Sequence, residues 1–124
     1  MLATKSLLDA GAPLALGTDY PASDSGDPLL NFFCAVTRRA ADGSPPEGFH
    51  PEERLPAETA LRLLTAGPAF AAFQEDDLGA LSPGRYADLT VLSEDPLRTP
   101  AHRLPELKVR MTVVGGRVEF RAKD

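Results

Sequence analysis

The sequence predicts an α/β chain in two parts, with a strand and helices over residues 1–74 and a small β unit over residues 75–124. The first part contains a short apolar run at 13–16, followed by stretches in which apolar residues recur at three- and four-residue spacing. The second part contains short runs of strand-forming residues and a Gly-Gly pair that is typical of a hairpin. These observations distinguish a helical half from a β half.

The composition is that of an ordinary globular chain. Its 124 residues suffice for one domain with a modest core, and 43% are hydrophobic and 25% charged. The 13 Lys and Arg residues against 18 Asp and Glu residues give a net charge of −5, which repels phosphate and disfavours nucleic acid and anionic membranes. No apolar run approaches the roughly 20 residues that span a membrane. We therefore expect a cytoplasmic protein without nucleic-acid or membrane partners.

The first elements are a helix end and a buried strand. Residues 4–11 are expected to be the tail of a helix that Thr4 or Ser6 caps and that Gly11 ends in the left-handed conformation. Residues 13–16 have no polar alternation, which is typical of a parallel strand buried on both faces. Such a strand leaves backbone groups unpaired, at about 1–3 kcal/mol each, unless other strands flank it. The sequence therefore predicts a piece of a larger protein, or a chain that assembles with a partner.

Two helical regions follow. Asp27 is the expected N-cap of the first, and Pro28 suits its first helical position. Its apolar side is formed by Leu29, Phe32, Phe33 and Val36. Residues 42–56 are rich in Gly, Pro and charge and are expected to form a long surface loop. In the second region Gly67 and Pro68 are expected to interrupt the helix, with Pro68 starting another short one.

The β unit ends in the clearest local signal of the chain. A Ser-Pro-Gly-Arg turn precedes a strand at 87–92, and a second strand is expected at 109–114. Gly115 and Gly116 separate this strand from a third at 117–120. A two-residue Gly-Gly connection favours a hairpin because both central residues must reach positive φ.

Three stretches, taken in order, resemble one known family. They are PLALGTDYP, then EERLPAETALRLLTAGPAFAAF, then GALSPGRYADLTVLSEDPL followed by VRMTVVGGRVEF. As a set they resemble the metal-dependent amidohydrolase superfamily, most closely its amidohydrolase-3 branch, from about residue 4 to residue 120. The resemblance implies that residues 1–74 are the eighth strand and following helices of a TIM-like barrel. It also implies that residues 75–124 are C-terminal strands of an accessory β-sandwich domain.

The resemblance assigns chemistry to Asp19, which matches the aspartate at the carboxyl end of the eighth strand. It implies that Asp19 is a ligand of a divalent metal, with zinc the expected ion, and a catalytic group that takes a proton from the attacking water. Barrel chemistry lies at this end of the strands. The implied reaction is hydrolysis of an amide or other non-peptide C–N bond in a small molecule, and Tyr20 is the expected substrate-binding residue. The residues alone leave another interpretation open, in which Asp19 is a turn former and Tyr20 packs.

The remaining ligands of the family, such as a His-x-His pair, are missing from this sequence. His50 and His102 do not have metal-ligand spacing, and both are expected to be solvated. The alternative for His50 is that it reaches toward a substrate from its loop. A catalytic zinc needs about three protein ligands. The resemblance therefore implies a C-terminal segment that is inactive alone, with the metal held in the intact enzyme and no complete site in this chain.

Other features have simpler interpretations. Cys34 is expected to be a buried, inert thiol, and the acidic run at 75–77 a solvated linker. The alternative to an enzyme segment is a non-catalytic α+β interaction or assembly module. Such a module would self-associate through its open sheet edges.

Overall fold

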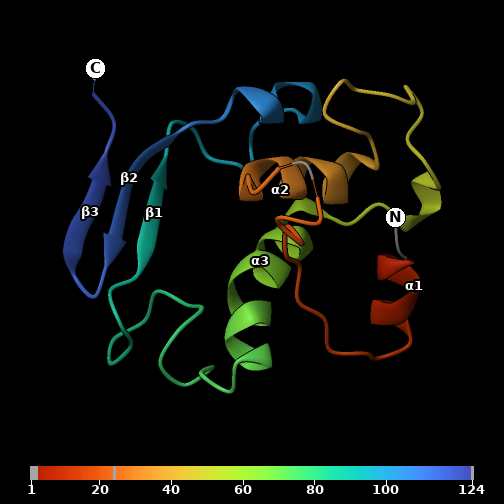
Figure 1. Ribbon diagram of the computed structural model, residues 1–124. Coiled ribbons are helices and arrows are strands. Elements are labelled where there is room, and N and C mark those ends of the chain that lie inside the picture. The colour runs from red at the N-terminus through yellow and green to blue at the C-terminus, as the bar shows by residue number, and fades with distance from the viewer. Residues whose placement is uncertain (1–2, 24, 124) are drawn as a thin grey trace.

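A computed structural model describes residues 3–23 and 25–123 of the chain. Helices alternate with long connections before a three-stranded sheet. The helices are α1 (Thr4–Asp9), α2 (Pro28–Thr37) and α3 (Ala57–Ala71), with short 3-10 helices η1 (Pro51–Glu53) and η2 (Ala101–Glu106), and the strands are β1 (Leu89–Leu92), β2 (Val109–Val114) and β3 (Arg117–Arg121). The sheet lies at one end of the molecule and α1 at the other, with α2 and α3 between them (Figure 1). In the described ranges no helix is long and apolar enough to cross a membrane.

The hydrophobic core joins the two halves of the chain. Helix α2 packs against α3 and against η2, which lies between β1 and β2 in the sequence. The buried cluster consists of Phe32, Phe33, Leu55, Ala60, Leu63, Leu104 and Leu107. Phe32 and Leu104 are each only 2% exposed, so a residue from the second half completes the core of the first. The division into a barrel part and a sandwich part at residue 74 stays a prediction.

Helix α2 forms as its sequence predicts. The Asp27 carboxylate accepts a hydrogen bond from the backbone N–H of Leu29 at 2.8 Å, and Pro28 occupies the first helical position. The helix ends at Arg38, whose φ of 61° is left-handed and whose N–H donates to the Cys34 carbonyl at 2.8 Å. Local capping signals therefore set both ends of this helix.

Residues 13–16 do not form the predicted strand. In the described part of the chain they pair with no strand, and Pro13 and Ala15 are exposed, so burial on both faces is wrong. Leu14 and Leu16 are half-buried instead, and the Leu16 N–H donates to the Leu63 carbonyl on α3 at 2.8 Å. The physical reason is that no strand of the described residues lies beside this segment, which packs against α3 instead.

Helix α3 is not interrupted at Gly67, and that prediction is wrong. It runs continuously from Ala57 to Ala71 with Pro68 inside it. A Cβ atom at Gly67 would lie 2.7 Å from the Leu14 carbonyl oxygen. Glycine is therefore needed here for the close approach of the 13–16 segment. Packing on both sides of Pro68, including burial of Ala69, outweighs the hydrogen bond that proline removes.

Helix α1 lacks the side-chain cap that the sequence predicts. The N-cap position is Ala3, which makes no side-chain hydrogen bond, and Ser6 lies inside the helix. The cap comes instead from Glu53 in η1, whose carboxylate accepts hydrogen bonds from the N–H and the hydroxyl of Ser6. Gly11, at φ 85°, follows the helix in the left-handed conformation, as predicted.

The long connection between α2 and α3 is more ordered than a surface loop. It contains η1, and Leu55 and Glu53 within it are buried. Gly48 has a φ of 84°, and a Cβ atom there would lie 2.6 Å from the Thr37 carbonyl oxygen. The Arg54 side chain donates to that same carbonyl at 3.3 Å. These contacts hold the connection against the end of α2.

The sheet confirms the predicted hairpin. Its strands run antiparallel in the order β1-β2-β3, and Gly115 and Gly116 connect the last two with φ values of 55° and 78°. The Asp88 carboxylate accepts a hydrogen bond from the Gly115 N–H at 2.6 Å and so ties the turn to the chain before β1. β3 is an edge strand of this sheet, and all of its residues are exposed.

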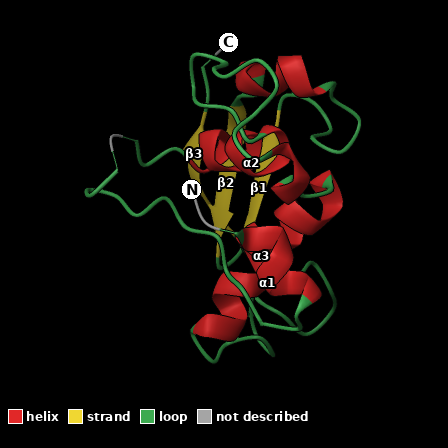
Figure 2. Cartoon of the chain, turned by 90° about the vertical axis from the view of Figure 1, so that its right-hand side faces the viewer, coloured by secondary structure: helices red, strands yellow, loops and turns green. Residues whose placement is uncertain are grey.

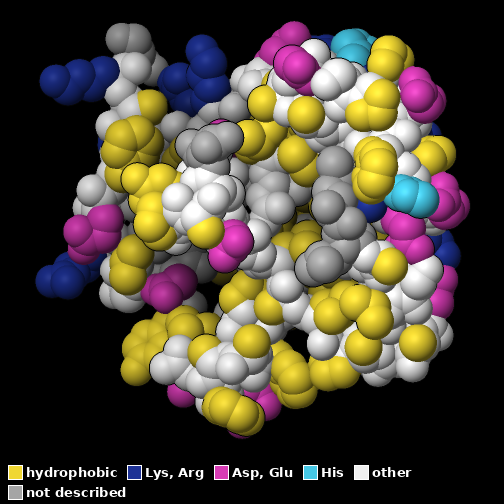
Figure 3. All heavy atoms as spheres, turned by 45° about the vertical axis from the view of Figure 1, so that its right-hand side comes forward, with side chains coloured by type: hydrophobic (Ala, Val, Ile, Leu, Met, Phe, Trp, Pro, Cys, Tyr) yellow, Lys and Arg dark blue, Asp and Glu magenta, His cyan; other side chains and the backbone are white. Residues whose placement is uncertain are grey.

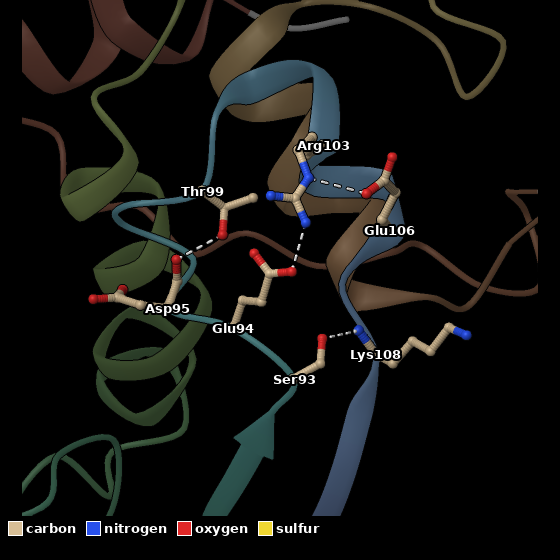
Figure 4. A network of polar contacts seen from close by, with 7 residues as sticks. All are labelled: Ser93, Glu94, Asp95, Thr99, Arg103, Glu106 and Lys108. Atoms are coloured by element: carbon tan, nitrogen blue, oxygen red, sulfur yellow. Dashed lines mark hydrogen bonds and ion pairs between the residues drawn. The ribbon is translucent and has the colours of Figure 1, made fainter.

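A polar network holds the connection between β1 and β2 (Figure 4). The Arg103 guanidinium pairs with Glu94 at 2.6 Å and with Glu106 at 3.1 Å. Ser93 and Lys108 exchange hydrogen bonds, with the Ser93 N–H donating to the Lys108 carbonyl at 2.9 Å. Exposed ion pairs are worth only about 0.2–1 kcal/mol each. The burial of Leu104 in η2 and of Leu107 just after it is therefore the larger contribution of this connection to stability.

Candidate functional site

Asp19 follows the 13–16 segment at the start of an exposed loop. Its φ of 57° is left-handed, a conformation that Asp tolerates better than most residues. Its carbonyl accepts a hydrogen bond from the Ser23 N–H at 3.0 Å. Within the described ranges no hydrogen bond or ion pair engages its exposed carboxylate. The loop projects away from the body of the molecule, on the left of Figure 2.

Side chains near Asp19 hold the backbone that precedes it. The Asn31 amide, from the middle of α2, donates to the Gly17 carbonyl at 2.8 Å. The Ser23 hydroxyl lies within hydrogen-bonding distance of the Thr18 carbonyl. Neither Asn31 nor Ser23 stands out as a site residue in the sequence. The available signal for Asn31 was its amide in an otherwise apolar helical run.

An open hollow of about 490 Å³ lies beside this loop, against α2. Its lining mixes hydroxyls, an amide, apolar atoms and two kinds of titratable group, and includes Thr18, Asn31, Cys34 and Asp42. Hydrogen bonds from Ser44 hold the pKa of the Asp42 carboxyl below its usual range. Cys34 is half-buried where a buried thiol was expected, and partial burial raises the pKa of the thiol, which favours its protonated form. The hollow presents more apolar than polar surface, from Leu30, Ala40 and Ala41 beside its hydroxyl and amide groups.

Tyr20 is 67% exposed. Its ring lies over Gly26, where an added Cβ atom would come within 3.5 Å of the ring. The ring thus covers the loop at Gly26, and Tyr20 is not among the residues that line the hollow. Its role in substrate binding stays a prediction.

The two histidines lie on the surface. The His50 ring is 2.7 Å from the Glu52 carboxylate and meets the Phe49 ring edge-on, with centroids 4.5 Å apart. His102 is exposed, as expected. In the described part of the chain, no group of three or more His, Cys, Asp or Glu side chains is placed to hold a metal ion. Because a catalytic zinc needs about three protein ligands, the described residues do not form a whole metal site. A ligand role for Asp19 stays a prediction.

Comparisons with known proteins define the class of the chain. The model of the Amidohydrolase family matches residues 1–120. The N-substituted formamide deformylase of Arthrobacter pascens is 34% identical over 116 residues, which cover 94% of this chain and 21% of that protein. The 5-methylthioadenosine/S-adenosylhomocysteine deaminase of Syntrophobacter fumaroxidans is 41% identical over 88 residues, which cover 69% of this chain and 18% of that protein.

A solved structure agrees with these matches. An amidohydrolase from Thermotoga maritima superposes with a TM-score of 0.67 at 26% identity, covering 97% of this chain and 26% of the other. The chain therefore belongs to the amidohydrolase family, which confirms the resemblance seen in the sequence. It spans about a fifth of the length of these two curated relatives.

Proposed function

We propose that this chain is the C-terminal segment of a metal-dependent enzyme that hydrolyses an amide or other non-peptide C–N bond in a small molecule. Residues 1–74 would complete a TIM-like barrel, and residues 75–124 would join its accessory β-sandwich. The relatives are a deformylase and a deaminase by name, and both names describe loss of a group across a C–N bond. The chain alone is expected to be inactive, because the described residues gather no complete metal site.

The observation that carries the proposal is the placement of Asp19. Its carboxylate is exposed, free of hydrogen bonds among the described residues, and carried by a loop that leaves the body of the fold (Figure 2). A divalent ion lowers the pKa of a bound water from about 15.7 to about 7. In our proposal Asp19 contributes one ligand, accepts the proton of the attacking water and delivers it to the leaving amine. Tyr20, one residue on, would contact the substrate.

A graft tests this assignment. The segment of the Arthrobacter pascens deformylase that aligns with this chain is replaced by residues 1–120, and hydrolysis of an N-substituted formamide is measured with and without Asp19→Asn. We expect an active graft whose kcat/KM falls at least about a hundredfold with Asp19→Asn, because a positioned acid–base group contributes roughly 10²–10⁴-fold. An active graft that tolerates Asp19→Asn would refute the role of Asp19.

A zinc titration of the 124-residue chain is the second arm. We expect no tight binding, and no difference between the natural chain and its Asp19→Asn variant. Tight binding that depends on Asp19 would show a self-contained metal site and would refute the segment proposal.

The alternative is a non-catalytic assembly module. It is favoured by the open β3 edge and by apolar side chains left in solvent, such as Phe73 at 91% and Leu81 at 75% exposure. Figure 3 shows hydrophobic side chains scattered over one face of the molecule. Sedimentation of the isolated chain separates the two ideas, since a module predicts a defined oligomer of this chain alone.

A further inference from the structure

Consecutive backbone carbonyls lead into and through Asp19, and each accepts a hydrogen bond. The Gly17 carbonyl accepts from the Asn31 side-chain amide at 2.8 Å. The Thr18 carbonyl accepts from the Ser23 hydroxyl, and the Asp19 carbonyl accepts from the Ser23 N–H at 3.0 Å. The peptide planes on both sides of Asp19 are therefore fixed by groups that do not touch its carboxylate.

These bonds connect the loop to a rigid element. Asn31 lies in α2 between Leu30 and Phe32, and Phe32 is one of the most buried residues of the core. The backbone of Asn31 is therefore held by the core, and its amide connects the loop to α2 at the surface. The Ser23 hydroxyl is also 2.9 Å from the Ser25 carbonyl, so its single proton is shared between carbonyls on the two limbs of the loop.

The same loop lacks the donors that would capture an aspartate side chain. An Asp in a turn usually accepts a hydrogen bond from the backbone N–H two residues on. At that position Pro21 has no N–H. The Tyr20 N–H faces the Thr18 hydroxyl at 3.4 Å, and the Ser23 N–H is taken by the Asp19 carbonyl. The left-handed backbone at Asp19 is thus held by other residues, and its carboxylate stays unbound.

We infer that Asn31 and Ser23 are positioning residues, which hold the backbone of Asp19 so that its carboxylate is presented to a ligand. This inference rests on the proposed function, which gives Asp19 its chemical role. Asn31 and Ser23 would act on the backbone that carries Asp19. It assigns neither of them contact with substrate or metal.

The test is NMR spectroscopy of the 124-residue chain. The Asn31→Asp variant keeps the size of the side chain and removes its donor, and Ser23→Ala removes the hydroxyl. We expect both to change the φ-sensitive HN–Hα coupling of Asp19 and to speed exchange of the Ser23 amide roughly tenfold, since each removes a hydrogen bond of the loop. The midpoint of thermal unfolding should stay within about 2 °C, because the core is untouched.

Two variants serve as controls. Ser23→Thr keeps the hydroxyl and should restore the Asp19 coupling. Ser25→Ala alters a hydroxyl of the same loop that binds the Asp27 N–H, away from the three carbonyls, and should leave the Asp19 coupling unchanged. An unchanged coupling in both Asn31→Asp and Ser23→Ala would overturn the inference. So would uniform loosening of all amides, which would mark Asn31 as an ordinary stabilising residue.

The graft described above separates the two proposals. If Asp19→Asn abolishes turnover, Asn31→Asp should lower kcat by about tenfold or more with little change in KM, since a misplaced group loses rate. A graft that needs Asp19 and ignores Asn31→Asp would overturn the positioning inference alone. A graft that ignores Asp19→Asn would overturn the proposed function, whatever the NMR result.

Discussion

The backbone N–H of Ser6 donates to the Glu53 carboxylate at 3.0 Å, across 47 residues of sequence. The Ser6 hydroxyl binds the other oxygen of the same carboxylate. Helix α1 has six residues, and isolated helices of this length are not stable in water. A residue of η1 therefore supplies the capping group that the start of α1 lacks. This contact also fixes the helix from which the Asp19 segment departs.

We expect Glu53→Gln to release the start of α1. The amide lacks the negative charge that favours a helix N-terminus and accepts through one oxygen in place of two. Exchange of the Ser6 amide should rise roughly tenfold, because a hydrogen bond to a charged group is lost. Glu52→Gln is the control, since the Glu52 carboxylate faces His50 in solvent. Equal effects of the two substitutions would contradict the capping role.

Acid should weaken the same contact. Hydrogen bonds from the side chain and backbone of Ser6, helped by the charge of Arg38, hold the pKa of Glu53 below its usual range. Because the folded pKa is lowered, the stabilisation is present above the unfolded value of about 4.3 and is lost as pH falls through the folded value. The difference in urea midpoint between the natural chain and Glu53→Gln should therefore shrink from pH 7 toward pH 3. A difference in urea midpoint that grows in acid would contradict a lowered pKa of Glu53 in the folded chain.

Phe32 should be the most costly single truncation in the core. It is 2% exposed and packs in the cluster that Leu104 completes. Phe32→Ala should lower the free energy of unfolding by about 3–5 kcal/mol through lost burial and a residual cavity. Phe120→Ala, at 48% exposure on β3, should cost less than about 1 kcal/mol. Chemical denaturation monitored by circular dichroism measures both free energies of unfolding. Equal losses in the two variants would show that Phe32 is not a core residue.

Gly67→Ala should destabilise the chain although alanine is the better helix former. In an exposed helix interior this change gains about 0.5–1 kcal/mol. Here the new methyl group would lie 2.7 Å from the Leu14 carbonyl oxygen, and we expect a net loss of about 1–2 kcal/mol. Thr65→Ala, on an exposed part of α3, should be neutral or stabilising. Stabilisation by Gly67→Ala would show that the 13–16 segment does not rest on α3.

Features with local causes could be predicted from the sequence. The cap at Asp27 and the turn at Gly115 depend on residues within a few positions, and both form as expected. The strand at 13–16 does not form, because a strand depends on paired neighbours and the described part of the chain places none beside this segment. A glycine at position 67 can indicate either a break in a helix or a close contact with another segment. The folded chain shows that here it permits a close contact.

The candidate site divides in the same way. Asp19 could be chosen from its motif, but the bond from Asn31 to Gly17 joins residues whose proximity no local pattern encodes. The Glu53 cap of α1 is non-local for the same reason. Asp19 as the residue that carries the chemistry stays a prediction, and the residues that hold its backbone could be found only in the folded chain.

The insertion of Leu104 beside Phe32 has a consequence for synthesis of the chain. Helices α2 and α3 leave the ribosome well before η2, so their shared interior stays uncovered until about residue 107 has emerged. Until then the nascent helices would expose a hydrophobic surface to which chaperones can bind. Folding during translation should then occur as one late event, visible as a single force peak in an arrest-peptide profile.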